Sequence, residues 1–235
     1  MRKYVSVGFL LLFPLLAAAQ TNSSQDIFTI NITPPTSPQD VQVRYFLSGD
    51  PSVQQASVAQ PGDNKIAIQT DVAGKPSKGF RAIVYSPGCQ FGTVTADNLS
   101  TSTRTADFQC QKLGTNTLHG KADISRFSGK HLQVEALYVC RWAGQFFHVP
   151  GLSISPFSVA KTKVADDGTF AIDLPDFTAD PVWNNLSKNA ALVFALIDSS
   201  NGEHLGRLAP PRDISRGSYL KVAASYPAEV EFTVK

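Results

Sequence analysis

The stretch "VADDGTFAIDLPDF", residues 164–177, decides the fold class of this chain. Asp167 and Gly168 suit a tight turn, because glycine accepts the positive φ that such turns require. After the turn Phe170, Ile172 and Leu174 alternate with small or polar residues, and the run ends at Pro175. Alternation with a period of two is typical of a strand with one buried face. The stretch therefore predicts a hairpin whose second strand faces a β-sheet core.

Similar short alternating runs, separated by Pro and Gly, fill the rest of the chain. The sequence contains 15 Pro and 16 Gly, and only 17% of its residues are charged. Many short strands between such turns are typical of all-β proteins. The runs lie at residues 26–35, 41–49, 65–88, 103–113, 118–125, 132–140, 191–209 and 219–235.

The N-terminus has the pattern of a targeting segment. Arg2 and Lys3 precede an almost wholly apolar run, Val5 to Leu16, and Ala17 to Ala19 supply small residues before Gln20. This order predicts a secretory signal peptide at residues 1–19. The alternative is an uncleaved anchor, but the run is shorter than the roughly 20 apolar residues of a spanning helix. We expect a secreted or periplasmic protein without a membrane span after cleavage.

The charge of the mature chain is balanced. The full sequence has 21 Lys and Arg against 19 Asp and Glu, and two of the basic residues lie in the signal peptide. Binding to nucleic acid requires a basic face that neutralises phosphates. No nucleic-acid partner is expected.

Three cysteines, Cys89, Cys110 and Cys140, indicate one disulfide in an oxidising compartment. Cys89 and Cys110 lie on either side of a Gly-, Thr- and Ser-rich loop, so we predict that they pair. Closing a loop of about 20 residues should contribute on the order of 3 kcal/mol. Cys140 ends an apolar run and is expected to be a buried thiol.

The segment Gly114 to Thr117 is the predicted boundary between two β units, residues 20–116 and residues 117–235. Residues 66–85 resemble a second segment about 52 residues further along the chain, which suggests an internal repeat. The alternative is that any two pairs of sandwich strands look alike.

Two segments resemble carboxypeptidase regulatory-like and transthyretin-like modules. "TDVAGKPSKGFRAIVY", residues 70–85, is similar to the part of these modules where an Asp and a Gly-Lys-Pro turn precede an alternating strand. "VADDGTFAIDLP", residues 164–175, is similar to their Asp-Gly-x-Phe strand. The resemblance implies an all-β fold of two immunoglobulin-like or transthyretin-like β-sandwich units, and it implies no activity.

Motifs of common enzymes are missing from the sequence. It has no G-x-S-x-G, H-E-x-x-H, Walker or Rossmann pattern, and its four His residues do not have metal-ligand spacing. We therefore expect a protein that is not an enzyme, with no catalytic residues, no metal site and no cofactor.

The aromatic loop, residues 141–158, is the candidate binding segment. Its candidate residues are Trp142, Phe146, Phe147 and His148. Exposed aromatic rings bind sugars or protein partners, whereas buried rings would cover the end of a core. The sequence favours an exported, non-catalytic binding or structural protein of the cell envelope or extracellular space, with an unknown protein or polysaccharide partner. The alternatives are a carbohydrate-binding module that uses this loop and a hydrolase with an unrecognised site.

Overall fold

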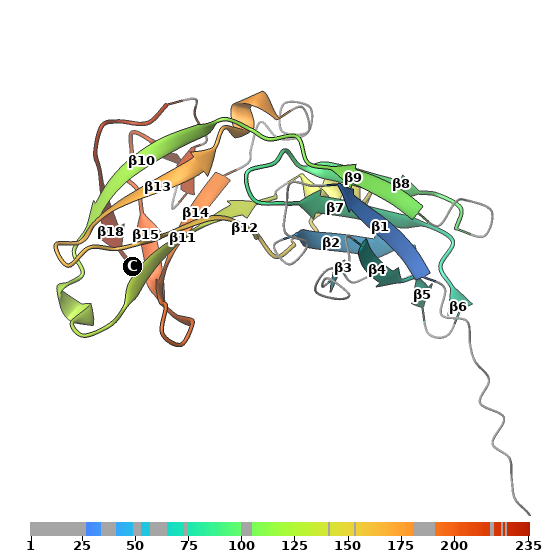
Figure 1. Ribbon diagram of the computed structural model, residues 1–235, viewed down its shortest axis with the longest axis horizontal. Helices are drawn as coiled ribbons and strands as arrows, with labels where there is room; N and C mark the ends of the chain where they lie inside the picture. Colours follow the sequence, from blue (N-terminus) through green and yellow to red (C-terminus); the bar gives the residue numbers. More distant parts are fainter. Residues whose placement is uncertain are drawn as a thin grey trace, which may run out of the picture.

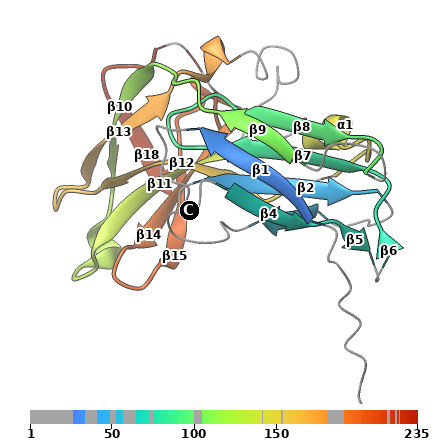
Figure 2. The ribbon, with the colours of Figure 1, turned by 45° about the vertical axis from the view of Figure 1, so that its right-hand side comes forward.

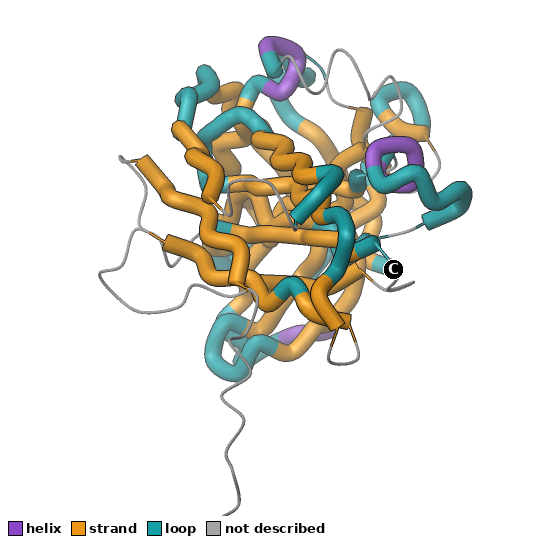
Figure 3. The backbone as a smooth tube through the Cα atoms, turned by 90° about the vertical axis from the view of Figure 1, so that its right-hand side faces the viewer, coloured by secondary structure: helices purple, strands orange, loops and turns teal. Residues whose placement is uncertain are grey.

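The structure is a computed structural model. It describes residues 27–33, 41–48, 53–56, 65–72, 75–99, 105–140, 142–152, 154–180, 191–216, 219–221, 223 and 225–235. The predicted signal peptide, residues 1–19, lies outside the described residues. The described part is mainly strand, with connecting loops and very little helix (Figure 3), and the chain forms two β-sandwiches that lie next to each other along the long axis (Figure 1). This confirms the all-β sandwich fold class.

The first sandwich packs a three-stranded sheet, in the order β4-β1-β9, on a four-stranded sheet, in the order β3-β2-β7-β8 (Figure 2). Its core contains the alternate residues Phe28, Ile30 and Ile32 of β1. The strands are β1 (Ile27–Thr33), β2 (Gln42–Leu47), β3 (Val53–Ala56), β4 (Lys65–Gln69), β5 (Asp71–Val72), β6 (Lys75–Pro76), β7 (Phe80–Tyr85), β8 (Gly92–Ala96) and β9 (Thr105–Gln109).

The second sandwich is built from one nine-stranded sheet that folds over its own core. The main path has the order β12-β11-β14-β15-β18-β10-β13. A short pairing of β15 with β18, through Leu208–Val234 and Ala209–Thr233, joins its two halves. The strands are β10 (Thr115–Ala122), β11 (Leu132–Val139), β12 (Phe157–Lys163), β13 (Thr169–Pro175), β14 (Ala191–Asp198), β15 (Glu203–Ala209), β16 (Ser215–Arg216), β17 (Tyr219–Lys221) and β18 (Val230–Val234).

The helical segments of the described residues are short. They are α1 (Ala143–Phe146) and the 3-10 turns Ser125–Phe127 and Phe177–Ala179.

The two sandwiches have the same strand order. In the first, the order is β4-β1-β9 in one layer and β3-β2-β7-β8 in the other; in the second it is β13-β10-β18 and β12-β11-β14-β15. In each sandwich the first strand pairs in parallel with the last one, β1 with β9 and β10 with β18. The fold thus contains one seven-stranded arrangement twice, with β1 equivalent to β10.

This equivalence corrects the internal repeat that the sequence suggested. Residues 66–85 span β4 to β7, and their structural equivalents are β13 and β14 rather than β10 and β11. The mistake arose because strands with one buried face share the same alternating pattern, so sequence similarity alone did not identify which strands of the two sandwiches are equivalent. The specific relation to carboxypeptidase regulatory-like or transthyretin-like modules stays a prediction.

The predicted boundary between residues 116 and 117 falls within β10, whose first residue is Thr115. The chain leaves the first sandwich after Gln109 and passes through residues 110–114. The limits of the two units as predicted, 20–116 and 117–235, remain a prediction.

For the stretch at residues 164–177 the prediction of buried residues is confirmed, whereas the prediction of a hairpin is wrong. Phe170, Ile172 and Leu174 are all buried in the core of the second sandwich. However, β13 pairs with β10, whereas β12 pairs with β11. The Asp167-Gly168 turn therefore carries the chain from one layer to the other and does not close a two-stranded hairpin. Both kinds of turn require the same residues, so the local sequence does not distinguish them.

Candidate functional site

The aromatic loop lies on the outer face of the four-stranded sheet of the first sandwich, where its helix α1 is seen behind β7 and β8 (Figure 2). We call this contact the junction, formed by β2, β7 and Phe91 on one side and by residues 138–158 and 177–180 on the other. Successive side chains of a strand point to opposite faces. The inward residues of β7, Phe80, Ala82 and Val84, belong to the first core, and the outward Ile83 and Tyr85 belong to the core of the second sandwich.

Phe91 is the central ring of the junction. It follows β7 in the first sandwich, is 1% exposed, and belongs to the core cluster of the second sandwich. Its ring centroid lies 4.5 Å from that of Tyr138 and 5.2 Å from that of Phe157. Trp142 and Phe177 lie at 6.4 Å and 5.6 Å. Edge-to-face and tilted ring pairs at such distances stabilise a core beyond the area that they bury.

The candidate binding residues of the aromatic loop divide into two groups. Trp142 is 4% exposed and Phe147 is 2% exposed, and both belong to the core cluster of the second sandwich. The indole N–H of Trp142 donates to the hydroxyl of Tyr138 at 3.2 Å, so the polar end of this ring is satisfied inside the protein. Phe146 is partly buried, and His148 is exposed. The rings of Trp142 and Phe147 thus have no open face on which a sugar could stack, and they match the alternative in which aromatic side chains cover a core.

Arg44 holds the aromatic loop by its backbone. Its Nε donates to the carbonyl of Ser155 at 3.2 Å, and its Nη2 donates to the carbonyl of Pro156 at 3.0 Å. Its guanidinium lies over the ring of Phe157, 4.8 Å from the centroid. Arg44 is buried, and this burial lowers its pKa, an effect that the neighbouring Cys140 opposes. A buried cation is stable only where its donors are paired, which explains why three carbonyl groups surround it.

Gln42 makes a second backbone contact at the junction. Its side-chain amide donates to the carbonyl of Ser158 at 2.7 Å and accepts from the N–H of the same residue at 2.9 Å. The hydroxyl of Ser158 in turn donates to Glu135, whose carboxylate lies 3.0 Å from the amino group of Lys161. The side chain of Gln42 therefore binds the first sandwich to the start of β12, through both backbone groups of Ser158.

Arg81 makes the outermost contact. Its Nη1 donates to the carbonyl of Phe146 at 2.9 Å and lies 3.0 Å from Nε2 of His148. Since arginine has no acceptor, Nε2 of His148 is the acceptor in this contact. His148 also has a φ of 59°, which is unusual for a residue other than glycine and marks a tight turn of the loop.

Cys140 is buried beside this network. Burial raises the pKa of its thiol well above the usual range, and Arg44 opposes that rise. A thiol of this kind is protonated at neutral pH and reacts slowly, because the thiolate is the nucleophile. The expectation of a buried, unpaired Cys140 therefore agrees with the structure.

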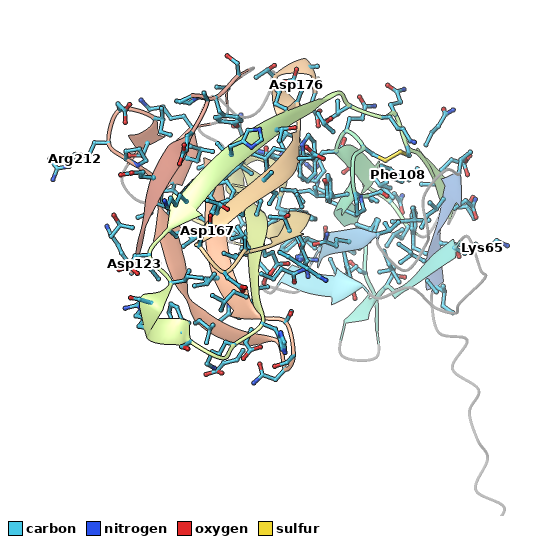
Figure 4. All side chains as sticks on the ribbon, turned by 60° about the vertical axis from the view of Figure 1, so that its left-hand side comes forward. Lys65, Phe108, Asp123, Asp167, Asp176 and Arg212 are labelled. Carbon is cyan, nitrogen blue, oxygen red and sulfur yellow. A yellow bond between two sulfur atoms is a disulfide. The ribbon has the colours of Figure 1, made fainter. Side chains whose placement is uncertain are left out.

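Cys89 and Cys110 form a disulfide, as the sequence predicted. Figure 4 shows it as the yellow bond in the first sandwich. The neighbouring Gln90 donates its backbone N–H to Gln111, and Leu113 donates to Gly88. These bonds attach the segment that carries Phe91 to the connection between the sandwiches.

Sequence reasoning missed the burial of Arg44 and the role of Phe91. Gln42, Arg44 and Phe46 alternate with the inward residues of β2, and no role was predicted for them from the sequence. One signal was present: the run Ala82 to Tyr85 is continuously apolar. A continuous apolar strand is typical of a sheet covered on both faces.

Two further observations concern chemistry. Within the described residues, no group of three or more His, Cys, Asp and Glu side chains is arranged to hold a metal ion. Among the same residues, no helix has the length and apolar character needed to cross a membrane.

Comparison with known proteins gives no family for the chain. No family model matches it, and no curated protein is similar to it in sequence. Among solved structures, the TIE protein of Bacillus anthracis is 7% identical, with a TM-score of 0.26; the match covers 89% of this chain and 33% of that one. This chain therefore spans about a third of that protein's length.

Two further solved structures also match at low sequence identity. Two B repeat units of the collagen binding protein of Staphylococcus aureus are 9% identical, with 89% of this chain and 49% of that one covered and a TM-score of 0.21. GBS52, the minor pilin of Streptococcus agalactiae, is 7% identical, with 89% and 96% covered and a TM-score of 0.28. At these scores the similarities support no inference, so the architecture rests on the strand pairing described above.

Proposed function

We propose that this protein is an exported, non-catalytic β-sandwich protein that serves as a binding or structural element of the cell envelope or the extracellular space. The N-terminal pattern of residues 1–19 supports export, and the disulfide between Cys89 and Cys110 suits an oxidising compartment. Secreted and periplasmic locations both fit these features.

The junction is the observation that carries this proposal. Domains in one chain usually move relative to one another, unless their interface is large and hydrophobic. Here Phe91, Tyr85 and Ile83 of the first sandwich are part of the core of the second. Arg44 and Gln42 add hydrogen bonds to the backbone of the same loop. Such a junction keeps two sandwiches at a fixed angle, which suits a protein that presents a surface or bears a load.

The proposed structural role is tested by measuring whether the two sandwiches keep a fixed arrangement in solution. Small-angle scattering of the mature chain should fit one rigid arrangement of the two sandwiches. The double variant Arg44→Ala/Gln42→Ala should broaden the distribution of interdomain distances, while Asn31→Ala, which alters an exposed contact with Asp107, should not. A mature chain that scatters as two independently moving sandwiches would contradict the proposal.

Export is tested separately. Expression of residues 1–235 with a C-terminal tag, followed by fractionation and N-terminal sequencing, should give a mature protein that begins at Gln20 outside the cytoplasm. A full-length product that stays in the cytoplasm would overturn the exported half, whatever the scattering shows.

The carbohydrate-binding alternative now depends on Phe146 and His148, because Trp142 and Phe147 are buried. A pull-down with insoluble polysaccharides would test it. Retention of the wild-type chain, together with loss on changing Phe146 to Ala, would favour that alternative over a protein partner.

A further inference from the structure

The outer face of the four strands β12, β11, β14 and β15 carries a second apolar surface. β14, "ALVFALID", is apolar over seven successive residues, and all eight of its residues are buried. Leu192, Phe194 and Leu196 point into the core of the second sandwich. Val193, Ala195 and Ile197 point the other way; they are only 3–7% exposed, yet they belong to neither core cluster.

A groove runs over this face. Two adjoining hollows of about 600 Å³ and about 630 Å³ share Val139 and Ile154. Leu137, Val139 and Val193 lie along the floor of the groove, and Pro156 and Tyr219 lie on opposite sides of it. The groove adjoins the end of the aromatic loop, because Pro156 lines the groove and its carbonyl accepts a hydrogen bond from Arg44 of the first sandwich.

β15 and β17 contribute two basic side chains to the face that carries the groove, and one of them, Arg207, lines it. Arg207 pairs with Ala195 across the strands, and Lys221 pairs with Ala191, so both side chains share the face of Val193. Both are exposed, and no described residue forms an ion pair with either of them. The acidic residue on the described part of this face near the groove is Glu135, and Lys161 neutralises it. Charge complementarity therefore favours an acidic partner.

The equivalent face of the first sandwich shows what such a surface can hold. The strands β2 and β7 are equivalent to β11 and β14, and their outer face is covered by the aromatic loop. There, apolar side chains of the loop pack on the sheet, as Phe147 does on Phe46, and basic side chains donate to its backbone carbonyls. The same fold thus holds an irregular segment, which includes the short helix α1, on this face.

We propose that the groove over β11 and β14 binds an extended acidic segment of a partner protein. Aliphatic side chains of the segment lie on the partly exposed Leu137 and Val139. Its carboxylates pair with Arg207, which lines the groove, and with Lys221, which lies on the same face. This inference deepens the binding role proposed above and rests on it. An apolar centre with a polar rim is the usual composition of a protein–protein interface.

The test uses a fluorescein-labelled synthetic peptide in which Glu alternates with Val, titrated with the mature chain and followed by fluorescence anisotropy. We expect saturable binding that weakens as salt is added. The variant Arg207→Glu/Lys221→Glu should weaken binding by about tenfold or more, as expected when close charge pairs are reversed. Lys121→Glu is the matched control, because Lys121 is exposed on β10 in the opposite layer, and it should change the affinity by less than about twofold.

Three outcomes would overturn the proposal. The first is equal affinity for the wild-type chain and the Arg207→Glu/Lys221→Glu variant, provided that both show the same melting temperature. The second is equal binding of a peptide in which Lys replaces every Glu. The third is the absence of peptide binding while a uronic-acid polysaccharide binds in a manner that depends on Arg207, which would make the occupant a carbohydrate. Export and rigidity are measured independently, so failure here leaves the proposed function standing.

Discussion

The carboxylate of Asp180 accepts a hydrogen bond of 2.8 Å from the backbone N–H of Phe91, and this bond joins the two sandwiches at the centre of their junction. Asp180 is completely buried, and it follows the 3-10 turn Phe177–Ala179. Phe91 contributes both its ring and its N–H to the second sandwich. Ring packing and the hydrogen bond together fix the position and the orientation of this residue.

Replacing Asp180 with Ala should destabilise the protein by about 1–3 kcal/mol, because the buried N–H of Phe91 loses its acceptor. Chemical denaturation measures the change. The control is Asp107→Ala, which removes an exposed hydrogen bond with Asn31 and should cost less than about 0.5 kcal/mol. Equal losses for both variants would show that the bond to Phe91 contributes nothing specific.

Replacing Trp142 with Ala should cost about 3–5 kcal/mol, as for other buried Trp or Phe residues that leave a cavity. If Trp142 were instead an exposed ligand-binding residue, the Trp142→Ala variant would have almost the melting temperature of the wild type. Ile27→Ala is the control, since Ile27 is 42% exposed. A Trp142→Ala protein with the melting temperature of the wild type would mean that the aromatic loop does not pack on the first sandwich.

Gly168 and Gly202 offer a matched pair of substitutions. Both have a positive φ, 84° and 74°, so a Cβ at either position is strained by about 1–2 kcal/mol. At Gly168 a Cβ would also lie 2.1 Å from the carbonyl oxygen of Ala122, whereas nothing lies within 4 Å of it at Gly202. We therefore expect Gly168→Ala to lower the melting temperature clearly more than Gly202→Ala does. Asp166→Asn, at an exposed turn position, should change it least.

Removing the disulfide by Cys89→Ser/Cys110→Ser should cost about 3 kcal/mol, since the two cysteines are 21 residues apart. Peptide mapping without reduction should recover the Cys89–Cys110 linkage. Cys140 should resist alkylation until the protein is unfolded, because it is buried and the pKa of its thiol is raised. Rapid alkylation of one thiol in the folded protein would contradict this assignment.

Acid should weaken the turn between β14 and β15. Asp198 accepts hydrogen bonds from the hydroxyl and the N–H of Ser200 and lies near Lys130, and these contacts lower the pKa of its carboxyl. A lowered folded-state pKa means that the stabilisation is present at neutral pH and is lost as the pH falls through the folded-state value, below about pH 4. The melting temperature of Asp198→Asn should therefore fall less between pH 7 and pH 3 than that of the wild type. Parallel losses would show that Asp198 has no part in the acid response.

The sequence predicted what each strand does locally and missed how the strands pair. Alternation placed Phe170, Ile172 and Leu174 in a core, and loop closure paired Cys89 with Cys110. Alternation contains no information about which neighbour a strand adopts, so β13 was expected beside β12 and lies beside β10 instead.

The junction was also beyond reach from the sequence, for a related reason. The outward residue Arg44 is buried by a loop whose Ser155 lies 111 positions further along the chain, and no local pattern in β2 indicates that distant cover. Continuous apolar runs in β7 and β14 were the available signal. They indicate that a second face is covered without identifying what covers it.

The connection between the second and third strands is much longer in one copy of the strand order than in the other. It is residues 48–52 in the first sandwich and residues 140–156 in the second. The longer connection reaches back over the preceding sandwich, whereas the corresponding face of the sandwich that supplies it carries the groove over β11 and β14. The molecule consequently has a polarity: the second sandwich supplies the covering segment and the first sandwich is covered, so association through the groove adds to one end of the molecule only.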